Sequence, residues 1–346
     1  MAIFENIDFD DHESVHTFSD PESGLKAFIA IHSTKCGPSA GGCRLWSYSD
    51  SATALTDALR LSRGMSYKNA MAGLNLGGGK AVVLRPSGDF DRTALFAAFG
   101  KAVDSLGGRY YTAEDVGVSP DDMRVVRQQT SFVAGLNDGE AASGDPSPVT
   151  ADGVFRAVRL AADKKLNAPL KGLRISVQGL GHVGYDVCRR LSIAGAHLIV
   201  TDINAELMRK TESAFGAKLV APDDIYGVDA DIYVPCALGA TINENTIDVL
   251  KIKAIAGAAN NQLSISKMGK FLHEKSILYC PDYVVNGGGI INIAGEIEGN
   301  YNKDWVEEKL QGLEATLVEI IECAAKTNRP TNEIADEMAQ SRIGRR

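Results

Sequence analysis

The stretch Leu173-Arg-Ile-Ser-Val-Gln-Gly179-Leu-Gly181-His-Val-Gly184 decides the fold class of the chain. Its first half predicts a short buried strand, and its three glycines predict a tight turn that opens a helix. A lone glycine pattern of this kind is weak evidence. Here it lies between a strand and a helix, and Asp202 directly follows the next predicted strand, at 197–201. This order is typical of a dinucleotide-binding βαβ unit.

The residue types of this unit suit the chemistry of a dinucleotide. Glycines let a pyrophosphate approach the backbone N–H groups at the start of the helix. Asp202, at the end of the second strand, can accept hydrogen bonds from the ribose hydroxyls. It is followed by Ile203 and Asn204 and not by an arginine that would offset a 2′-phosphate. The sequence therefore favours NAD over NADP.

The rest of the chain also alternates strands with helices. In the second half, short strands are expected at 231–235, 254–257 and 277–280. In the first half, strands are expected at 25–32, 80–85 and 109–112, and helices from Ser51 to about Met71 and from Asp91 to Leu106. A loop at 36–43 would place backbone N–H groups beside a ligand. The expected fold class is α/β, with a C-terminal Rossmann-type doubly wound domain for NAD.

The pattern predicts two domains. Residues 1–145 would form a substrate-binding and catalytic domain, and residues 146–327 would form the NAD-binding domain. A terminal helix within 328–346 would complete the first domain. A segment rich in Gly, Ser, Asp and Pro, at 135–148, would link the two, with the active site in the cleft between the domains.

Two lysines bracket a run of small residues in the first domain, Lys68 and Lys80, and Lys80 directly follows three glycines. A lysine at the wall of a closed pocket has its pKa lowered by desolvation, which suits it to catalysis. Asp115 follows a predicted strand, where open α/β sheets place ligand-binding groups. Each residue has a structural alternative, a solvent-exposed lysine beside a turn and a turn-capping aspartate.

The composition argues against several classes of function. A net charge of −8, without a basic block, disfavours nucleic acid or an anionic membrane as a partner. No apolar run is long enough to span a membrane, and the acidic N-terminus lacks the regions of a signal peptide, so we expect a cytoplasmic protein. The six cysteines and six histidines lack metal-ligand spacing, so reduced thiols and no bound metal are expected.

Several motifs, in order along nearly the whole chain, carry a family resemblance. They are Cys36-Gly-Pro-Ser-Ala-Gly-Gly-Cys43, Tyr67-Lys-Asn69, Leu74-Asn-Leu-Gly-Gly-Gly-Lys80, Thr112-Ala-Glu-Asp-Val-Gly117, Val177-Gln-Gly-Leu-Gly181, Ala256-Gly-Ala-Ala-Asn-Asn261 and Pro281-Asp-Tyr-Val-Val-Asn-Gly-Gly-Gly289. Together they resemble the glutamate/leucine/phenylalanine/valine dehydrogenases, and the leucine branch most strongly. After Lys80 the chain departs from the usual pattern at a turn, Leu84-Arg-Pro-Ser87, which leaves the lysines intact.

The resemblance implies NAD-dependent oxidative deamination of an L-amino acid to a 2-oxo acid and ammonium, a reversible reaction. Lys80 would activate water and Asp115 would shuttle protons. The resemblance implies substrate contacts from Lys68, Gly41, Gly42 and Asn260, and from the apolar pocket residues Ala40, Met65, Ala113, Ile290 and Ile293. It implies cofactor contacts from Gly179, Gly181, Val183, Gly184, Asp202, Thr150, Cys236, Ala237 and Asn260, with Thr150 at the nicotinamide amide. A homo-oligomer, from dimer to octamer, is also implied.

The apolar pocket disfavours glutamate as the substrate and leaves leucine, valine and isoleucine as the first expectation. Ala40 is smaller than the residue typical of the leucine branch and leaves room for an aromatic side chain, whereas the bulk of Ile290 favours branched aliphatic side chains. A phenylalanine or tryptophan dehydrogenase of the same family therefore stays open. From a different class, a non-catalytic NAD-binding regulator is the alternative, which the intact Lys68, Lys80 and Asp115 disfavour.

Overall fold

The computed structural model describes residues 3–136, 145–237, 239–299 and 301–345. The chain divides into two compact units. Unit 1 comprises Met1–Asp145, Asn292–Val306 and Ala339–Arg346, and unit 2 comprises Pro146–Ile291 and Glu307–Met338. The first boundary falls inside the predicted linker, of which residues 137–144 lie outside the described part of the chain.

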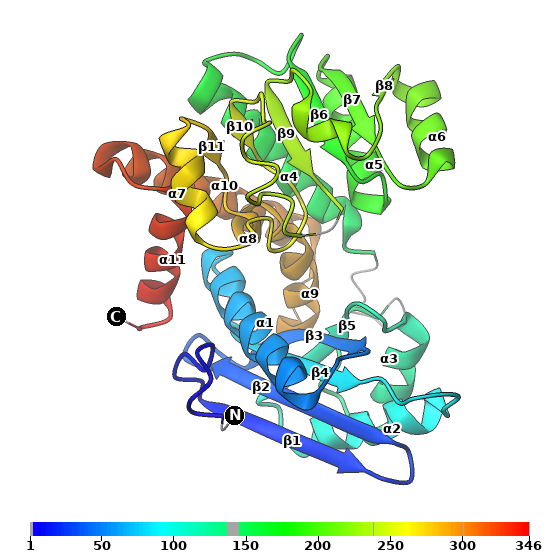
Figure 1. Ribbon diagram of the computed structural model, residues 1–346. Coiled ribbons are helices and arrows are strands. Elements are labelled where there is room, and N and C mark those ends of the chain that lie inside the picture. The colour runs from blue at the N-terminus through cyan, green and yellow to red at the C-terminus, as the bar shows by residue number, and fades with distance from the viewer. Residues whose placement is uncertain (1–2, 137–144, 238, 300, 346) are drawn as a thin grey trace. The chain divides into compact units, whose positions relative to one another are not determined.

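Unit 1 is built on a mixed sheet of five strands (Figure 1). The strands are β1 (Ser14–Asp20), β2 (Leu25–Ser33), β3 (Ser39–Trp46), β4 (Gly77–Leu84) and β5 (Tyr110–Glu114). Their spatial order is β1-β2-β4-β3-β5. β1, β2 and β4 pair antiparallel, whereas β3 pairs parallel with both β4 and β5. The strand predicted at 25–32 is therefore confirmed, and β1 was not predicted.

Helices cover both faces of this sheet. α1 (Ser51–Met71) packs on one face, where Ala54, Leu55, Ala58 and Leu59 meet Ala30 and Val82 of the sheet. α2 (Arg92–Asp104) and α3 (Pro120–Arg127) belong to the larger core on the opposite face. The side chains of Asp50 and Asp91 cap α1 and α2, as aspartates before a helix do. Both helices match the sequence prediction within a few residues.

The loop predicted at 36–43 is wrong over most of its length, because Ser39 already begins strand β3. Glycines indicate a turn in a sequence, but here they serve close packing inside the sheet. A Cβ on Gly41 would lie 1.9 Å from the carbonyl oxygen of Gly79, and a Cβ on Gly78 would lie 2.0 Å from the backbone nitrogen of Ser66 on α1. Only glycine fits such positions, so the motif is a strand that packs closely against β4, and α1 in turn approaches β4 closely.

Unit 2 confirms the predicted doubly wound fold. Its six strands, all pairing parallel, stand in the order β11-β10-β9-β6-β7-β8. They are β6 (Arg174–Gln178), β7 (His197–Thr201), β8 (Lys218–Leu219), β9 (Ile232–Pro235), β10 (Ala254–Ile255) and β11 (Leu278–Tyr279). The connecting helices are α4 (Ser147–Ala161), α5 (His182–Ile193), α6 (Ala205–Phe215), α7 (Lys267–Glu274) and α8 (Asp282–Val285). The strand order reverses beside β6, where such folds bind ligands.

Three helices pass through a unit boundary, and this differs from the predicted domain limits. They are α9 (Gly288–Glu298), α10 (Lys303–Thr327) and α11 (Thr331–Arg342). Residues 292–306 therefore belong to unit 1, and of the predicted range 328–346 only 339–346 does. The start of α11 is held in unit 2 because the Thr331 hydroxyl donates to the Tyr279 carbonyl and the Tyr283 hydroxyl donates to Asp336. The predicted limit at 327 is the end of α10, shortly before Pro330, whereas the boundaries between the units lie inside the helices.

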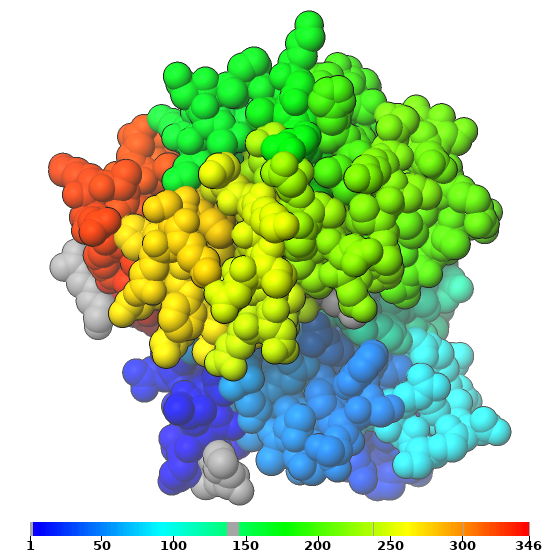
Figure 2. All heavy atoms as spheres, turned by 45° about the horizontal axis from the view of Figure 1, so that its top comes forward, coloured from blue at the N-terminus to red at the C-terminus, as the bar shows by residue number. Residues whose placement is uncertain are grey.

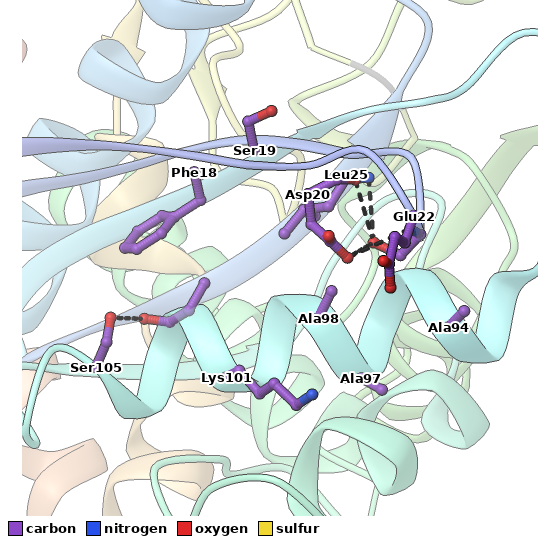
Figure 3. A pocket seen from close by; sticks show the side chains of 12 residues that line it. Phe18, Ser19, Asp20, Glu22, Leu25, Ala94, Ala97, Ala98, Lys101 and Ser105 are labelled. Atoms are coloured by element: carbon purple, nitrogen blue, oxygen red, sulfur yellow. Dashed lines mark hydrogen bonds between the residues drawn. The ribbon is translucent and has the colours of Figure 1, made fainter.

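A groove of about 760 Å³ lies between the β1–β2 turn and α2 in unit 1 (Figure 3). Phe18 points toward α2, and Ala94, Ala97, Ala98 and Lys101 form the helical wall. The residues that line it include none of the predicted site residues. Within the described ranges, no helix is long and apolar enough to cross a membrane.

Candidate active site

The predicted substrate residues of unit 1 come together around one face of its sheet. Lys80 of β4 pairs with Ala30 of β2, which packs against α1, so Lys80 points to the α1 side. In β3 and β5, Gly42 pairs with Ala113, and Ala40 pairs with Gly78 and Tyr111. From above this face, α1 contributes Met65 and Lys68. The segment from Met65 to Lys80 therefore runs from the last turns of α1 into strand β4.

Lys80 and Asp115 form an ion pair. The Nζ of Lys80 lies 2.7 Å from Oδ2 of Asp115, and the two side chains are only 7 % and 23 % exposed. Asp115 directly follows β5, as predicted. Burial alone would raise the pKa of Asp115, but the charges of Lys80 and Arg44 outweigh burial and lower it. The carboxylate is therefore ionised at neutral pH, and Lys80 is not the solvent-exposed lysine of the structural alternative.

The glycines of β3 bring backbone close to this pair. A Cβ on Gly42 would lie 2.8 Å from the Cβ of Asp115, and one on Gly41 would lie 3.1 Å from the Cγ of Met65. Ala40 and Ala113 are almost fully buried beside them. The structure thus brings together Lys80, Asp115, Gly41, Gly42, Ala113 and Met65 of the predicted site.

Arg44 belongs to the same group and was missed in the sequence. Its Nε donates to Oδ2 of Asp115 over 3.2 Å, and its Nη1 donates to Oδ2 of Asp57 over 3.0 Å. The hydroxyl of Tyr48 donates to the same oxygen of Asp57 over 2.5 Å. Arg44 stands one residue after the Cys36–Cys43 motif and two after Gly42, so strand alternation, once the strand is recognised, places it beside Gly42.

The glycine loop of unit 2 is closely packed at two of its glycines and open at the remaining one. Gly179 has φ of +94°, and a Cβ there would lie 2.7 Å from the backbone nitrogen of Ala237. A Cβ on Gly184 would lie 1.9 Å from the Gly179 carbonyl oxygen, so the third glycine permits close packing of helix on strand. A Cβ on Gly181 would meet nothing within 4 Å. The backbone at the start of α5, where Val183 lies in the first turn, is thus open to a ligand.

Asp202 lies beside this loop, at the end of β7. Its Oδ2 accepts from the backbone nitrogen of Leu180 over 2.6 Å, and its Oδ1 accepts from that of Asn204 over 2.7 Å. These bonds fix the carboxylate and tie it to the glycine loop, while each oxygen keeps a further lone pair. Ile203 next to it is 96 % exposed, and the following segment with α6 lies at the surface of unit 2 (Figure 2).

Thr150 and Asn260 also lie in unit 2, and Asn286 joins them. Thr150 in α4 lies near Gly289, where a Cβ would come within 2.9 Å of its hydroxyl oxygen. The Nδ2 of Asn286 donates to Oδ1 of Asn260 over 2.8 Å, and Oδ1 of Asn286 is buried without a partner among the described residues. Asn286 lies inside the motif at 281–289, and the family resemblance implied no role for it.

The two isoleucines predicted for the pocket lie on α9, on opposite sides of a unit boundary. Ile290 belongs to unit 2 and Ile293 to unit 1. Two carboxylates of α9 attach it to unit 1, since Glu296 accepts from Gly135 and Glu298 accepts from Asn75. Across the described ranges, no group of three or more His, Cys, Asp or Glu side chains could hold a metal ion.

Comparisons with known proteins match most of the chain to one family. The family described as "Glu/Leu/Phe/Val dehydrogenase, dimerisation domain" matches residues 12–132, and that described as "Glutamate/Leucine/Phenylalanine/Valine dehydrogenase" matches residues 200–343. The chain belongs to the Glu/Leu/Phe/Val dehydrogenase family. The resemblance drawn from the motifs is therefore confirmed, and the chain is an oxidoreductase of the amino-acid dehydrogenase class.

Individual members of the Glu/Leu/Phe/Val dehydrogenase family match over nearly the full length. A leucine dehydrogenase of Bacillus subtilis (strain 168) is 47 % identical over 346 residues, which cover 100 % of this chain and 95 % of the relative. A phenylalanine dehydrogenase of Caldalkalibacillus thermarum is 44 % identical, with 97 % and 92 % covered. The crystal structure of L-tryptophan dehydrogenase from Nostoc punctiforme is similar with a TM-score of 0.86 at 39 % identity, and 99 % and 98 % of the chains are covered.

Proposed function

We propose that this family member catalyses the reversible, NAD-dependent oxidative deamination of an apolar L-amino acid, with leucine, valine and isoleucine as its substrates, to the 2-oxo acid and ammonium. The observation that carries the proposal is the buried Lys80–Asp115 ion pair beside the backbone of Gly41 and Gly42. A base and a proton carrier side by side are what this reaction needs. The identity to leucine dehydrogenases over the whole chain supports the substrate class.

The residues of unit 1 would act on the substrate and on water. Lys68 and the backbone at Gly41 and Gly42 would hold the carboxylate of the amino acid. After Cα is oxidised to an iminium carbon, a deprotonated Lys80 would take a proton from the water that adds to that carbon. Asp115 would carry the proton that Lys80 took from water to the nitrogen. Lys80 would then take the hydroxyl proton as the C=O bond forms and the C–N bond breaks, and that proton would leave with the ammonia as ammonium. The ammonium ion and the 2-oxo acid balance the added water.

The residues of unit 2 fit a dinucleotide. The open backbone at Gly181 and the start of α5 would hold the pyrophosphate, and Asp202 would accept from the adenosine ribose. Thr150, Asn260, Cys236 and Ala237 would line the nicotinamide end, where the unpartnered Oδ1 of Asn286 is an available acceptor for an amide. The chemistry that NAD supplies when bound is acceptance of the hydride from Cα.

The pocket residues favour two different sizes of substrate side chain. Ala40 is small and Ile290 is bulky, so phenylalanine or tryptophan is the second candidate, and relatives with those names share 44 % and 41 % identity with the chain. No lysine stands among the pocket residues Ala40, Met65, Ala113, Ile290 and Ile293 to meet a second carboxylate, so glutamate is not proposed.

We also propose that the chain acts as a homo-oligomer in a reducing, cytoplasmic compartment. The match of residues 12–132 to a domain described as a dimerisation domain supports self-association. The six cysteines are free thiols, which supports a reducing compartment. Static light scattering should give a native mass that is a multiple of the 36.9 kDa chain, and a monomer at micromolar concentration would contradict the proposal.

The deciding experiment follows NADH formation at alkaline pH with leucine, valine, isoleucine, phenylalanine, tryptophan and glutamate. We expect the highest kcat/KM with a branched aliphatic substrate and no turnover of glutamate. A higher value for phenylalanine or tryptophan would select the second candidate. Failure of all six substrates, with NAD binding intact in a calorimetric titration, would identify a non-catalytic NAD-binding regulator.

A further inference from the structure

One arginine in the catalytic region of unit 1 has no assigned role. Arg44 donates to Asp115 through Nε and to Asp57 through Nη1. Lys80 and Arg44 both meet Asp115 at the same oxygen, Oδ2, over 2.7 Å and 3.2 Å. One side of the carboxylate is therefore held by two cations from two neighbouring strands, β4 and β3.

We propose that Arg44 is a positioning residue that holds Asp115 ionised and oriented as the proton carrier while Lys80 is engaged with water. This inference rests on the proposed function and adds a residue to it. Lys80 cannot both hold Asp115 as a cation and act as a neutral base on water. Arg44 stays charged at every working pH, so it keeps a partner on Oδ2 after Lys80 has lost its proton.

The geometry behind Arg44 supports this role. Asp57 on α1 accepts from Nη1 of Arg44, and Tyr48 donates to Asp57, so the guanidinium is fixed from behind. Arg44 and Asp57 are both only about a quarter exposed. A guanidinium that bridges two carboxylates in its planar fork has little freedom to turn. A series of hydrogen bonds thus fixes the position of the carboxylate, and it runs from Tyr48 through Asp57 and Arg44 to Asp115.

The other groups around Asp115 do not take over this role. Cys43 of β3 and Tyr110 of β5 both interact with its charge, but burial raises the pKa of each far above the neutral range, so both stay uncharged. Lys80 and Arg44 are the cations that lower the pKa of Asp115 against the effect of burial. Arg44 is thus the permanent cation of the two.

The sign of the pH effect follows from these charges. Asp115 must be ionised to take up the proton that it carries, so proton transfer is lost as the pH falls through its pKa. Removing Arg44 leaves burial and Lys80 and raises that pKa, so the acidic limb of kcat/KM moves to higher pH. Asp57→Asn removes a partner of Nη1 but leaves the charge of Arg44 in place, so the limb should stay at the wild-type pH. A purely structural role predicts no movement of the limb in either variant.

The test compares Arg44→Met, Arg44→Lys and Asp57→Asn with Arg92→Met in the full-length enzyme. Arg92 is a matched control, since it forms a similar pair with Asp122 in the same unit, over 2.6 Å. For Arg44→Met we expect a loss in kcat of about 10- to 10²-fold, because misplacement of a reacting group is costly. The amino-acid KM should change much less, and Arg44→Lys should recover part of kcat. Arg92→Met should change the unfolding temperature without moving the limb.

A direct readout separates this inference from the proposed function. Titration of carboxyl-¹³C-labelled aspartate by NMR, assigned with Asp115→Asn, reports the pKa of Asp115 without any turnover. A higher pKa in an Arg44 variant supports the inference even if no amino acid is oxidised, and in that case only the proposed function fails. An active wild type whose Asp115 pKa and acidic limb are unchanged in Arg44→Met would overturn the inference. If Arg44→Met does not fold, Arg44→Gln removes the same charge and gives the same comparison.

Discussion

At the scale of single residues, the glycines before Lys80 explain how a lysine becomes buried in a sheet. A Cβ on Gly77 would lie 2.0 Å from the Ser33 carbonyl oxygen, and one on Gly79 would lie 2.7 Å from the ring of Tyr110. The strand can therefore pass close to its neighbours and to α1 only without side chains at these positions. Lys80 is the first residue after them to carry a side chain, and it is 5 % exposed. An unpaired ammonium there would be unstable, so Asp115 is required as its partner.

Lys80 gives the first prediction. Lys80→Ala should reduce kcat by at least about 10²-fold, because general base catalysis is lost. Binding of NAD should be unchanged, since the residues proposed to hold it lie in unit 2. Stopped-flow kinetics and a calorimetric NAD titration measure both quantities, with Lys26→Ala as a control for an exposed lysine in the same sheet. A Lys80→Ala enzyme with near wild-type kcat would remove Lys80 from the mechanism.

Asp202 gives the second prediction, which concerns the choice of cofactor. Its carboxylate would meet a 2′-phosphate as a like charge, and a like charge without compensation costs several kcal/mol, so we expect kcat/KM for NAD to exceed that for NADP by about 10²-fold or more. Asp202→Ser should weaken the binding of NAD and reduce the ratio of kcat/KM for NAD to that for NADP. Because the carboxylate also accepts from Leu180, part of the loss will come from the glycine loop.

Asn204→Ala separates these effects, since Asn204 caps α6 beside Asp202 without a carboxylate. We expect it to lower stability and to leave the ratio of NAD to NADP unchanged. Equal kcat/KM for the two cofactors in the wild type would show that Asp202 does not contact the ribose.

The sequence predicted Lys80 and Asp115 but not Arg44, for a physical reason. Lys80 follows glycines and Asp115 follows a strand, and both are local signals. Arg44 acquires its role only when β3 is placed between β4 and β5, next to Asp57 of α1. That juxtaposition comes from the sheet order, which the spacing of residues along the chain does not contain.

At the scale of elements, α1 is the helix that carries the predicted carboxylate site, with Met65 and Lys68 near its end. Its last carbonyl groups, at Ala70 and Met71, accept hydrogen bonds from Nη1 of Arg342 over 3.3 and 3.1 Å. The hydroxyl of Tyr67 accepts from Gln340 over 3.0 Å. A helix leaves its final carbonyls without partners, and a cation there also suits the helix dipole. The C-terminal segment therefore secures the end of α1.

The third prediction tests this contact. Arg342→Ala should lower the free energy of unfolding by about 1 kcal/mol and raise the amino-acid KM, because the last turn of α1 loosens around Lys68. Urea denaturation and steady-state kinetics measure the two effects. Arg342→Lys keeps a cation at the helix end and should lose less of both. An Arg342→Ala enzyme with unchanged stability would show that the contact contributes nothing.

Elements differ in how well the sequence predicted them. α1 and β7 were predicted at their observed limits, because a long apolar periodicity and a compact β-branched run are strong signals. β3 was predicted as a loop, since its glycines and alanine match a turn when packing is unknown. β10 and β11 have two residues each, shorter than predicted, because pairing with neighbouring strands and not composition sets the length of a strand.

At the scale of the whole molecule, unit 1 is discontinuous in sequence. Its body, 1–145, is joined by 292–306 and 339–346 from beyond unit 2. Arg345 donates to the carbonyls of Asp10, Asp11 and His32, and Ile343 is 2 % exposed. The sequence predicted the main body, 1–145, and a terminal helix within 328–346 that returns to it, of which 339–346 belongs to unit 1. It did not predict the return of 292–306, because no local pattern marks a segment whose partners lie far away along the chain.

The last prediction follows from this discontinuity. A fragment of residues 1–145 should lack the stability that the returning segments supply. Burial of Ile343 alone is worth about 1.5–3 kcal/mol, and each buried carbonyl left without its donor costs about 1–3 kcal/mol. A unit of this size has a total stability of only about 5–15 kcal/mol, so the loss should be visible as rapid amide exchange along α1 and β2.

Joining 339–346 to the fragment through a Gly/Ser linker should restore part of the protection, whereas the same linker with Arg342, Ile343 and Arg345 replaced by alanine should not. Amide protection in the plain fragment equal to that in the full chain would mean that residues 1–145 fold on their own and that the returning segments do not stabilise them.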